Sequence, residues 1–280
     1  MKLRRDGVAS GPPKPEAYRL SVSDIPPVYE HLVEENRKFT VIPCARISTE
    51  ADVGLVSGGF ARENLTAVVS IEIFRHGVRI MTATGTIVSP DGYILTAAHI
   101  LAGDSYRVML KYGGDAFTYD ARVAAPPAAW CDMGILRICG PGVIPGGFPV
   151  LPLRGPGESV DPDEKIIIAG YPFGDRISGD RTGLVLSKLP GNVVSIQEMS
   201  CVVGRERSGR AVRKPVLHVF TDTSAKAGNS GSPVIAESDG RVAGVFSGTV
   251  NATGEEIDFF YPTEYFWENY TDGTGYTLPE

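Results

Sequence analysis

The sequence predicts an all-β fold in two consecutive halves, followed by one short helix. Segments rich in Val, Ile, Thr and Tyr run from Leu65 to Ile138, separated by turns that contain Gly and Asp. A second series of such segments runs from about Lys165 to Tyr261. Many short strands between frequent turns are typical of barrels. The hydrophobic share of 42% in 280 residues is ample for two cores.

The regions beside the strands are predicted from their glycine, proline and helix-capping residues. Gly140–Gly157 is dense in Gly and Pro, so we expect it to connect the two halves across the surface. Thr263 is expected to cap the final helix, which runs to about Tyr270 and faces the barrel with its aromatic residues. The predicted boundaries are 1–60 for an N-terminal extension, 61–270 for the folded domain with barrels at about 62–140 and 160–262, and 271–280 for a tail.

The N-terminal extension is expected to be partly flexible. Gly11–Pro15 is typical of a linker. A short helix is expected to begin at Ser23 or Asp24. The stretch after Met1–Asp6 is Gly/Pro-rich where an export signal would need an apolar segment. We therefore expect a cytoplasmic location.

Composition argues against two classes of partner. The formal net charge is -6, and no run of Lys or Arg is long enough to form a nucleic-acid or anionic-membrane surface. No apolar run is long enough to cross a bilayer. The sequence therefore predicts no nucleic-acid partner and no membrane insertion, and it leaves the oligomeric state open.

The four cysteines predict neither a disulfide framework nor a metal site. Cys131 and Cys139 flank one predicted strand, and at about 3.3 Å per residue its ends lie too far apart to bridge. Neither these two nor Cys44 and Cys201 show close zinc-ligand spacing. We expect reduced thiols, no metal and no cofactor.

One serine has the surroundings of a nucleophile. Ser230 lies in the segment Lys226–Pro233, where glycines on both sides let backbone approach backbone. A hydroxyl that attacks a carbonyl leaves an oxyanion, so the turn that presents it should aim N–H groups at that oxygen. The backbone amides of Gly228, Asn229 and Ser230 are the candidate donors. The alternative is a plain Gly/Ser/Pro turn.

Two upstream segments supply the groups that such a serine needs. His99 follows a strand, a Pro-Asp-Gly turn and a second strand, so it stands at the end of an element, where catalytic groups tend to lie. Asp132 opens an apolar strand, where a buried carboxylate needs a partner. A neutral imidazole is such a partner, because the carboxylate holds one tautomer and stabilises the imidazolium. A structural histidine and a solvated turn acid are the alternatives.

Together these segments resemble the trypsin-like serine peptidases of the chymotrypsin fold. His99, Asp132 and Ser230 occur in the chain order of that family. The resemblance covers about residues 64–267 and is nearest to the bacterial high-temperature-requirement and glutamyl endopeptidase branches, without a PDZ domain. The motifs that carry it are Gly85–His99, Asp132–Leu136, Gly170–Gly174, Gly228–Gly231 and Phe259–Pro262.

The resemblance implies two six-stranded antiparallel β-barrels with the active site at their interface. His99 would act as the base, Asp132 would orient it, and Ser230 would form an acyl-enzyme. Ser247 would contact the carboxylate of Asp132. The substrate pocket would be lined by Ser224, Ala225, Phe246, Ser247, Gly248, Thr249 and Phe260. Because no charge is expected at its floor, we expect an uncharged P1 residue.

Three positions depart from the family pattern. Asn229 stands where digestive members carry an aspartate that pairs with a new N-terminal amine, so activation by that ion pair is not expected. Ser232 replaces a commoner glycine, as in the glutamyl endopeptidases. Phe246 stands where that branch reads glutamate with a histidine, which argues against glutamate specificity.

Three functions remain open from the sequence. The first is a serine endopeptidase that performs limited cleavage of a protein partner, because uncontrolled degradation would threaten its host. The second is a catalytically silent binding module, which would more readily have lost one of the three residues. The third is a serine esterase, against which the missing Gly-x-Ser-x-Gly elbow argues.

Overall fold

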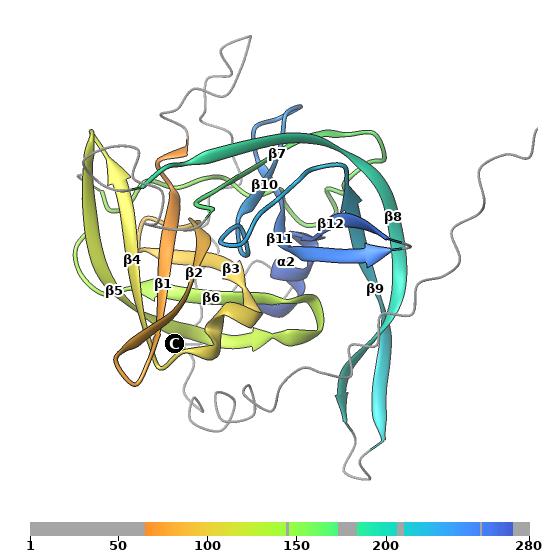
Figure 1. Ribbon diagram of the computed structural model, residues 1–280, viewed down its shortest axis with the longest axis horizontal. Coiled ribbons are helices and arrows are strands. Elements are labelled where there is room, and N and C mark those ends of the chain that lie inside the picture. Colours follow the sequence, from red (N-terminus) through yellow and green to blue (C-terminus); the bar gives the residue numbers. More distant parts are fainter. Residues whose placement is uncertain (1–64, 144–145, 173–183, 206–209, 253, 271–280) are drawn as a thin grey trace, which may run out of the picture.

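Two six-stranded antiparallel barrels lie side by side in the computed structural model (Figure 1). The structure describes residues 65–143, 146–172, 184–205, 210–252 and 254–270. The expected helix after position 23, the flexible linker and Cys44 lie outside these residues.

The first barrel has the strand order β1-β2-β3-β6-β5-β4 and closes through the pairing of β1 with β4. The Pro-Asp-Gly turn between β2 and β3 is made by the Gly92 N–H, which donates to the Ser89 carbonyl (3.0 Å). Gly92 has φ 82°, a conformation that glycine adopts without steric cost. The strands are β1 (Val68–Arg75), β2 (Val78–Ile87), β3 (Tyr93–Ala97), β4 (Ser105–Tyr112), β5 (Asp115–Ala128) and β6 (Met133–Ile138).

The second barrel has the order β10-β11-β12-β9-β8-β7 and closes through the pairing of β7 with β10. β8 and β9 form a long hairpin that extends beyond the barrel (Figure 1). The strands are β7 (Lys165–Gly170), β8 (Ser187–Arg205), β9 (Ala211–Thr221), β10 (Pro233–Ala236), β11 (Val242–Ala252) and β12 (Glu255–Pro262).

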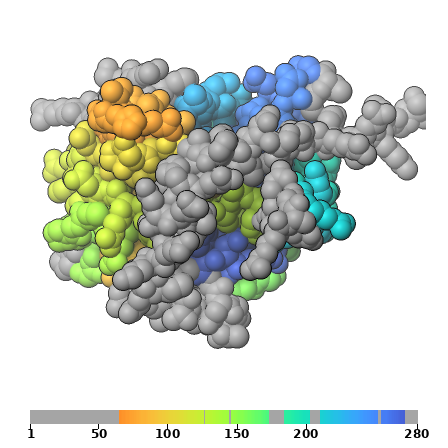
Figure 2. Space-filling model, turned by 90° about the horizontal axis from the view of Figure 1, so that it is seen from below, coloured from red at the N-terminus to blue at the C-terminus, as the bar shows by residue number. Residues whose placement is uncertain are grey.

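Each barrel encloses fully buried aliphatic side chains, and each such side chain contributes about 1.5–3 kcal/mol on burial. Ile71, Ile73 and Ile94 belong to the first core. Ile166 and Ile168 belong to the second, together with Phe260 from β12. The view from below shows the first barrel, coloured orange to yellow-green, beside the cyan and blue atoms of the second half of the domain (Figure 2). The two cores support the loops that meet between the barrels.

The connection between the barrels is not confined to the surface, contrary to the expectation for Gly140–Gly157. Leu151 and Leu153 are buried, and Leu153 forms a parallel bridge with Val242 of β11. The apolar residues in this Gly/Pro-rich segment pack into the core because their backbone groups find partners there. The Arg154 N–H, for example, donates to the Val242 carbonyl (2.9 Å).

The C-terminal helix, α2 (Glu264–Tyr270), follows β12 as predicted, and its aromatic residues are buried. Thr263 precedes it, and the Thr263 carbonyl accepts from the Phe266 and Trp267 N–H groups. The Thr263 hydroxyl instead donates to the carbonyl of Arg154 (3.5 Å), so it does not act as the expected side-chain cap. Within the described ranges, no helix combines the length and apolar character needed to span a membrane.

Candidate active site

His99 and Asp132 are brought together by the pairing of β3 with β6. Ala97, the last residue of β3, pairs with Met133, the first residue of β6. The Ala98 N–H donates to the Asp132 carbonyl (2.9 Å) and extends this pairing by one step. His99 then stands in the 3₁₀ helix that follows β3, while Asp132 directly precedes β6.

The carboxylate of Asp132 holds His99 through two hydrogen bonds. The His99 backbone N–H donates to Oδ1 (2.8 Å), and the ring Nδ1 lies 2.8 Å from Oδ2. Because a carboxylate only accepts, the proton of the second bond is on Nδ1. This leaves Nε2 of the neutral ring as the nitrogen that accepts a proton.

The turn that presents Asp132 is supported by α2. The buried Tyr270 hydroxyl donates to the Met133 carbonyl (2.8 Å) and accepts from the Ala128 N–H (3.1 Å). These two backbone groups flank the 3₁₀ helix Ala129–Cys131 that ends at Asp132. Asp132 itself has φ 48°, a left-handed conformation that Asp tolerates better than most residues.

Burial and Asp132 shift the pKa of His99 in opposite directions. Burial lowers this pKa, because it disfavours the imidazolium, whereas the Coulomb attraction of Asp132 and its hydrogen bond raise it. The pKa of His99 is raised on balance. Asp132 therefore favours the protonated ring that would form when His99 accepts a proton.

Ser247 contacts the same carboxylate from the second barrel. Its hydroxyl donates to Asp132 Oδ2, which is the contact that the sequence resemblance implied. The preceding residue, Phe246, accepts a hydrogen bond at its carbonyl from the Gly231 N–H (2.8 Å). Strand β11 therefore links Asp132 to the turn that carries Ser230.

The turn that carries Ser230 is docked on the first barrel by Thr84 of β2. The Thr84 N–H donates to the Ser230 carbonyl (2.9 Å), and its hydroxyl donates to the Gly228 carbonyl (2.8 Å). The same hydroxyl accepts from the Tyr171 N–H (2.9 Å). Sequence reasoning missed this role, because a threonine in a strand carries no local sign of what it faces.

A close backbone contact requires glycine at position 231. Gly231 has φ 83°, and a Cβ there would lie 2.2 Å from the Thr84 carbonyl oxygen and 2.9 Å from the Ala97 nitrogen. Ala97 ends the strand that leads to His99. The residue next to Ser230 therefore touches the segment that carries His99, at the seam between the barrels.

Two of the three predicted oxyanion donors have N–H groups without an acceptor in the described ranges. The Asn229 N–H donates to the Lys226 carbonyl (3.0 Å), so its prediction as a free donor is wrong. This turn has a positive φ of 100° at Gly228 but not at Ala227, which is the pattern of a type II turn. Among the residues that the structure describes, nothing accepts a bond from the Gly228 or Ser230 N–H.

The hydroxyl of Ser230 is at the seam without a bond to His99. Within the described part of the chain, no hydrogen bond joins Ser230 Oγ to His99 Nε2. The His99 side chain is 39% exposed, so a substrate can reach it. Catalytic hydrogen bonds are often long before substrate binds and tighten in the complex.

Asn229 and Ser232 are buried behind the turn. A Cβ on Gly170, at the end of β7, would lie 2.5 Å from Asn229 Oδ1 and 2.2 Å from Ser232 Oγ, so these side chains require glycine there. Their side-chain polar atoms find no partner among the described residues. The neutral side-chain amide of Asn229 thus occupies the position where digestive members of the family carry an aspartate.

The predicted pocket residues separate into two groups. The side chains of Phe246 and Phe260 pack in the second core, where their exposures are 3% and 0%. These two aromatic residues therefore do not form the pocket surface. The predicted residues that retain exposed surface are Ser224, Ala225, Ser247, Gly248 and Thr249.

A buried carboxylate that sequence reasoning missed links two of the segments predicted to line the pocket. Asp258 of β12 accepts hydrogen bonds from the Ala225 N–H (2.7 Å) and from the Thr249 hydroxyl (2.7 Å). Asp258 is 2% exposed, so the expectation of a pocket floor without charge stays a prediction. Asp258 is opposite Thr249 only through the register of β11 with β12, which a bulge between Phe246 and Gly248 shifts.

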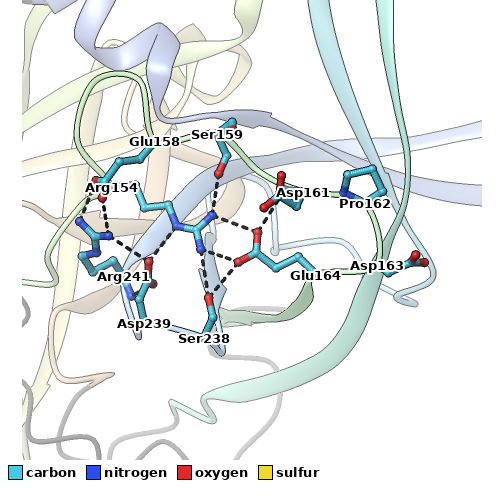
Figure 3. A pocket seen from close by; sticks show the side chains of 10 residues that line it. All are labelled: Arg154, Glu158, Ser159, Asp161, Pro162, Asp163, Glu164, Ser238, Asp239 and Arg241. Atoms are coloured by element: carbon cyan, nitrogen blue, oxygen red, sulfur yellow. Dashed lines mark hydrogen bonds and ion pairs between the residues drawn. The ribbon is translucent and has the colours of Figure 1, made fainter.

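An open pocket of about 460 Å³ lies elsewhere and contains none of these residues (Figure 3). Arg154 is at its centre, and all five of its guanidinium N–H groups have acceptors. They donate to Asp239, to Glu164 twice, to the Ser159 carbonyl and to the Ser238 hydroxyl. This network leaves no guanidinium donor for a ligand, so we interpret it as structural.

The described ranges contain no cluster of His, Cys, Asp and Glu that could hold a metal ion. Cys131, Cys139 and Cys201 are free thiols.

Comparison with known proteins identifies the class to which this fold and site belong. Residues 83–245, more than half of the chain, match the family model described as "Trypsin-like peptidase domain". The chain belongs to the trypsin-like peptidase family. The predicted family and the predicted fold class are thereby confirmed.

The curated relatives are HtrA-type serine proteases. The chain is 30% identical over 204 residues to Serine protease HTRA1 of Xenopus laevis, and the aligned region covers 71% of this chain and 39% of that protein. It is 34% identical over 206 residues to mitochondrial Serine protease HTRA2 of Bos taurus, again 71% of this chain and 39% of that protein. The chain therefore spans about two fifths of the length of these relatives.

Solved structures share the fold. The active form of the Rv3671c protease from M. tuberculosis has a TM-score of 0.55 at 21% identity, covering 78% of this chain and 84% of that chain. The serine endoprotease from Yersinia pestis has a TM-score of 0.53 at 20% identity, covering 74% and 62%.

Proposed function

We propose that this protein is a serine endopeptidase that uses Ser230 as nucleophile, His99 as general base and Asp132 as orienting acid. The observation that carries the proposal is the hydrogen bond from His99 Nδ1 to Asp132, which leaves Nε2 as the acceptor. The turn that carries Ser230 docks on Thr84 of β2 and touches Ala97, the end of the strand that leads to this histidine. Base and nucleophile thus come from different barrels, and neither half would act alone.

In the proposed cycle His99 takes the proton of Ser230 while Ser230 Oγ attacks the peptide carbonyl. The N–H groups of Gly228 and Ser230 bind the negative oxygen that forms. His99 then protonates the leaving amine, and the acyl group stays on Ser230. Water, activated by His99, repeats the sequence and releases the acid product.

The substrate is proposed to be a protein or peptide, with limited cleavage of a protein partner as the physiological reaction. The free Gly228 and Ser230 amides support catalysis over a silent binding module, because a binding module needs no oxyanion donors. The cytoplasmic location and the absence of a nucleic-acid partner stay predictions.

A fluorophosphonate probe, which reacts with activated serines, tests this proposal. The parent protein should be labelled, whereas Ser230→Ala should not be, and its turnover of a peptide library should fall on the order of a millionfold. Ser224→Ala is the matched control, because it removes an exposed serine hydroxyl near the same site and should still be labelled.

Two outcomes would contradict the proposal. No labelling of the folded parent protein would favour the binding module. Labelling with ester turnover, but without cleavage of any peptide in the library, would favour the esterase.

A further inference from the structure

Asp132 stands at the end of a short turn that does little by itself to fix its position. The 3₁₀ helix η6 (Ala129–Cys131) has three residues, and Asp132 follows it with φ 48° and ψ 40°. Even for Asp this left-handed conformation is less favourable than a right-handed one, so contacts around it must hold it. The Asp132 N–H donates to the Ala129 carbonyl over 3.4 Å, which is long for a hydrogen bond. The contacts of Trp130, inside the same turn, therefore help to decide where the carboxylate lies.

Two elements outside the first barrel hold the half-buried Trp130 ring. Tyr265 of α2 contacts it edge to face, with the ring centroids 4.9 Å apart. The Lys214 ammonium of β9 lies 3.3 Å from the Trp130 ring centroid. A cation over an aromatic face is attracted by the ring electrons, and indole is the best such partner among side chains. Both α2 and the long hairpin of β8 and β9 (Figure 1) thus fix this ring.

Lys214 is itself held in place. Its ammonium forms an ion pair with Glu268 of α2 (3.1 Å). Leu217, on the same strand, donates its N–H to the Tyr265 hydroxyl (2.6 Å). Strand β8 also contacts η6. The hairpin and the helix are therefore bonded to each other, and both reach the turn that presents Asp132.

We propose that Lys214 and Trp130 are positioning residues that hold the carboxylate of Asp132 against His99; this rests on the proposed peptidase function. Trp130 precedes Asp132 by two residues in the same turn, so a ring that loses its cation can move and carry the carboxylate with it. Lys214 touches neither the substrate nor a reacting atom. It acts through the turn, and it links the hairpin of the second barrel to the base in the first.

His99 is the group whose titration reports where Asp132 lies. Burial lowers the pKa of His99, and the charge and hydrogen bond of Asp132 raise it, so a carboxylate that moves away raises it less. Cys131, Tyr261 and Tyr270 also lie close enough to interact with this carboxylate. Burial raises the pKa of each of these three groups, so they stay neutral near neutral pH.

The test is Lys214→Met, which keeps most of the apolar stem and removes the cation. We expect kcat to fall about three- to tenfold. The midpoint of the kcat/KM pH profile should move to lower pH by about half a pH unit, because a displaced carboxylate stabilises the imidazolium less. Direct loss of a positive charge would instead raise the pKa of His99 and move the midpoint to higher pH. The direction of the change therefore separates positioning from a direct effect of charge.

Two further substitutions on β9 serve as controls. Lys214→Arg keeps a cation over the ring, so it should restore both kcat and the midpoint. Arg213→Met removes the neighbouring exposed cation, which donates to the Ser200 carbonyl (3.0 Å) rather than to the ring, and should keep the parent values.

Trp130→Leu tests the contact from its other side. It should lower the midpoint in the same direction, and Lys214→Met should add no further loss to it, because both substitutions break one contact. A midpoint that stays or rises in Lys214→Met, or losses that add in the double variant, would overturn the proposal while fluorophosphonate labelling of the parent keeps the peptidase assignment. Absence of labelling in the parent would instead overturn the proposed function.

Discussion

The seam between the barrels and the Arg154 network are both polar, yet they differ in how completely their groups are paired. In the network, every guanidinium N–H of Arg154 has an acceptor, and the side chain is 8% exposed. At the seam, the N–H groups of Gly228 and Ser230 have no acceptor among the described residues. The comparison shows that an open pocket can serve stability, whereas unfilled donors indicate a place for a substrate.

The largest change expected from breaking the network is a loss of stability. Arg154→Met should lower the free energy of unfolding by about 3–5 kcal/mol, because it leaves Glu164, which is 11% exposed, without its buried cation and removes one of the two arginines paired with Asp239. Denaturant unfolding measures this, and kcat of the folded protein should stay unchanged.

A partly exposed arginine of the same pocket provides the matched control. Arg241→Met removes the ion pairs with Glu158 and Asp239, whose side chains are 43% and 26% exposed, so it should cost about 1 kcal/mol. Equal losses from both variants, or a loss of kcat in Arg154→Met, would break the division between a stability region and a catalytic region.

A smaller effect, now on activity, is expected from Thr84→Val. The substitution removes the hydroxyl that holds the Gly228 carbonyl and accepts from the Tyr171 N–H. Leaving these buried groups unpaired costs about 1–3 kcal/mol, so kcat should fall about tenfold or more as the turn loosens.

Thr86→Val is the control for this substitution. Thr86 is buried on the same strand, and its hydroxyl has no hydrogen-bond partner among the residues that the structure describes. Its removal should leave kcat unchanged in steady-state assays with a peptide substrate. If both variants lose activity equally, Thr84 acts only through packing of β2.

The smallest expected effect is a pH dependence with opposite signs for activity and stability. Because the pKa of His99 is raised above 6.5, kcat/KM should fall with acid at a midpoint above that value, since the imidazolium cannot take the Ser230 proton. The raised pKa of His99 also stabilises the folded protein. This contribution is complete at pH values below the pKa of His99 in the unfolded chain, and it disappears as the pH rises through the raised pKa of the folded protein.

Acid should destabilise the Arg154 network, whereas it preserves the stabilising contribution of His99. The hydrogen bond from Arg241 lowers the pKa of Glu158, although burial opposes this shift. Burial raises the pKa of Glu164, but the hydrogen bonds from Arg154 and Ser238 outweigh it, so this pKa is also lowered. Their stabilisation is present above the usual pKa of 4.5 and is lost as pH falls through the lowered values. Activity and the free energy of unfolding, each measured across the pH ranges in which His99 and these two glutamates titrate, distinguish the active site from the Arg154 network. An activity midpoint below 6.5 would contradict the His99 assignment.

Local patterns were sufficient for the elements and for the chemistry-bearing residues. Alternating strands, the Pro-Asp-Gly turn before β3 and the aromatic helix after β12 are encoded within short segments, and each was predicted. His99, Asp132 and Ser230 were recognisable because each has its own local motif. The bond from Ser247 to Asp132 followed from the family resemblance, since nothing around Ser247 indicates it.

Residues whose roles depend on distant segments were not predictable. Thr84 and Tyr270 act through backbone groups far away in the chain, and burial of Leu153 depends on its bridge to Val242. Asn229 was counted as a free donor because its turn type depends on the φ of Gly228, which the composition of the turn does not specify.

Sequence alone was thus enough to establish the family, the two-barrel architecture and the identity of the candidate base, acid and nucleophile, because these depend on short-range periodicity and motif order. Only the tertiary structure decided which amides are free, that Thr84 supports the serine turn, and that Asp258 links the segment before Ser230 to β11. The physical reason is that strand register and barrel closure set these contacts. A shift of one residue in the pairing of β11 with β12 would turn Asp258 to the other face of the sheet.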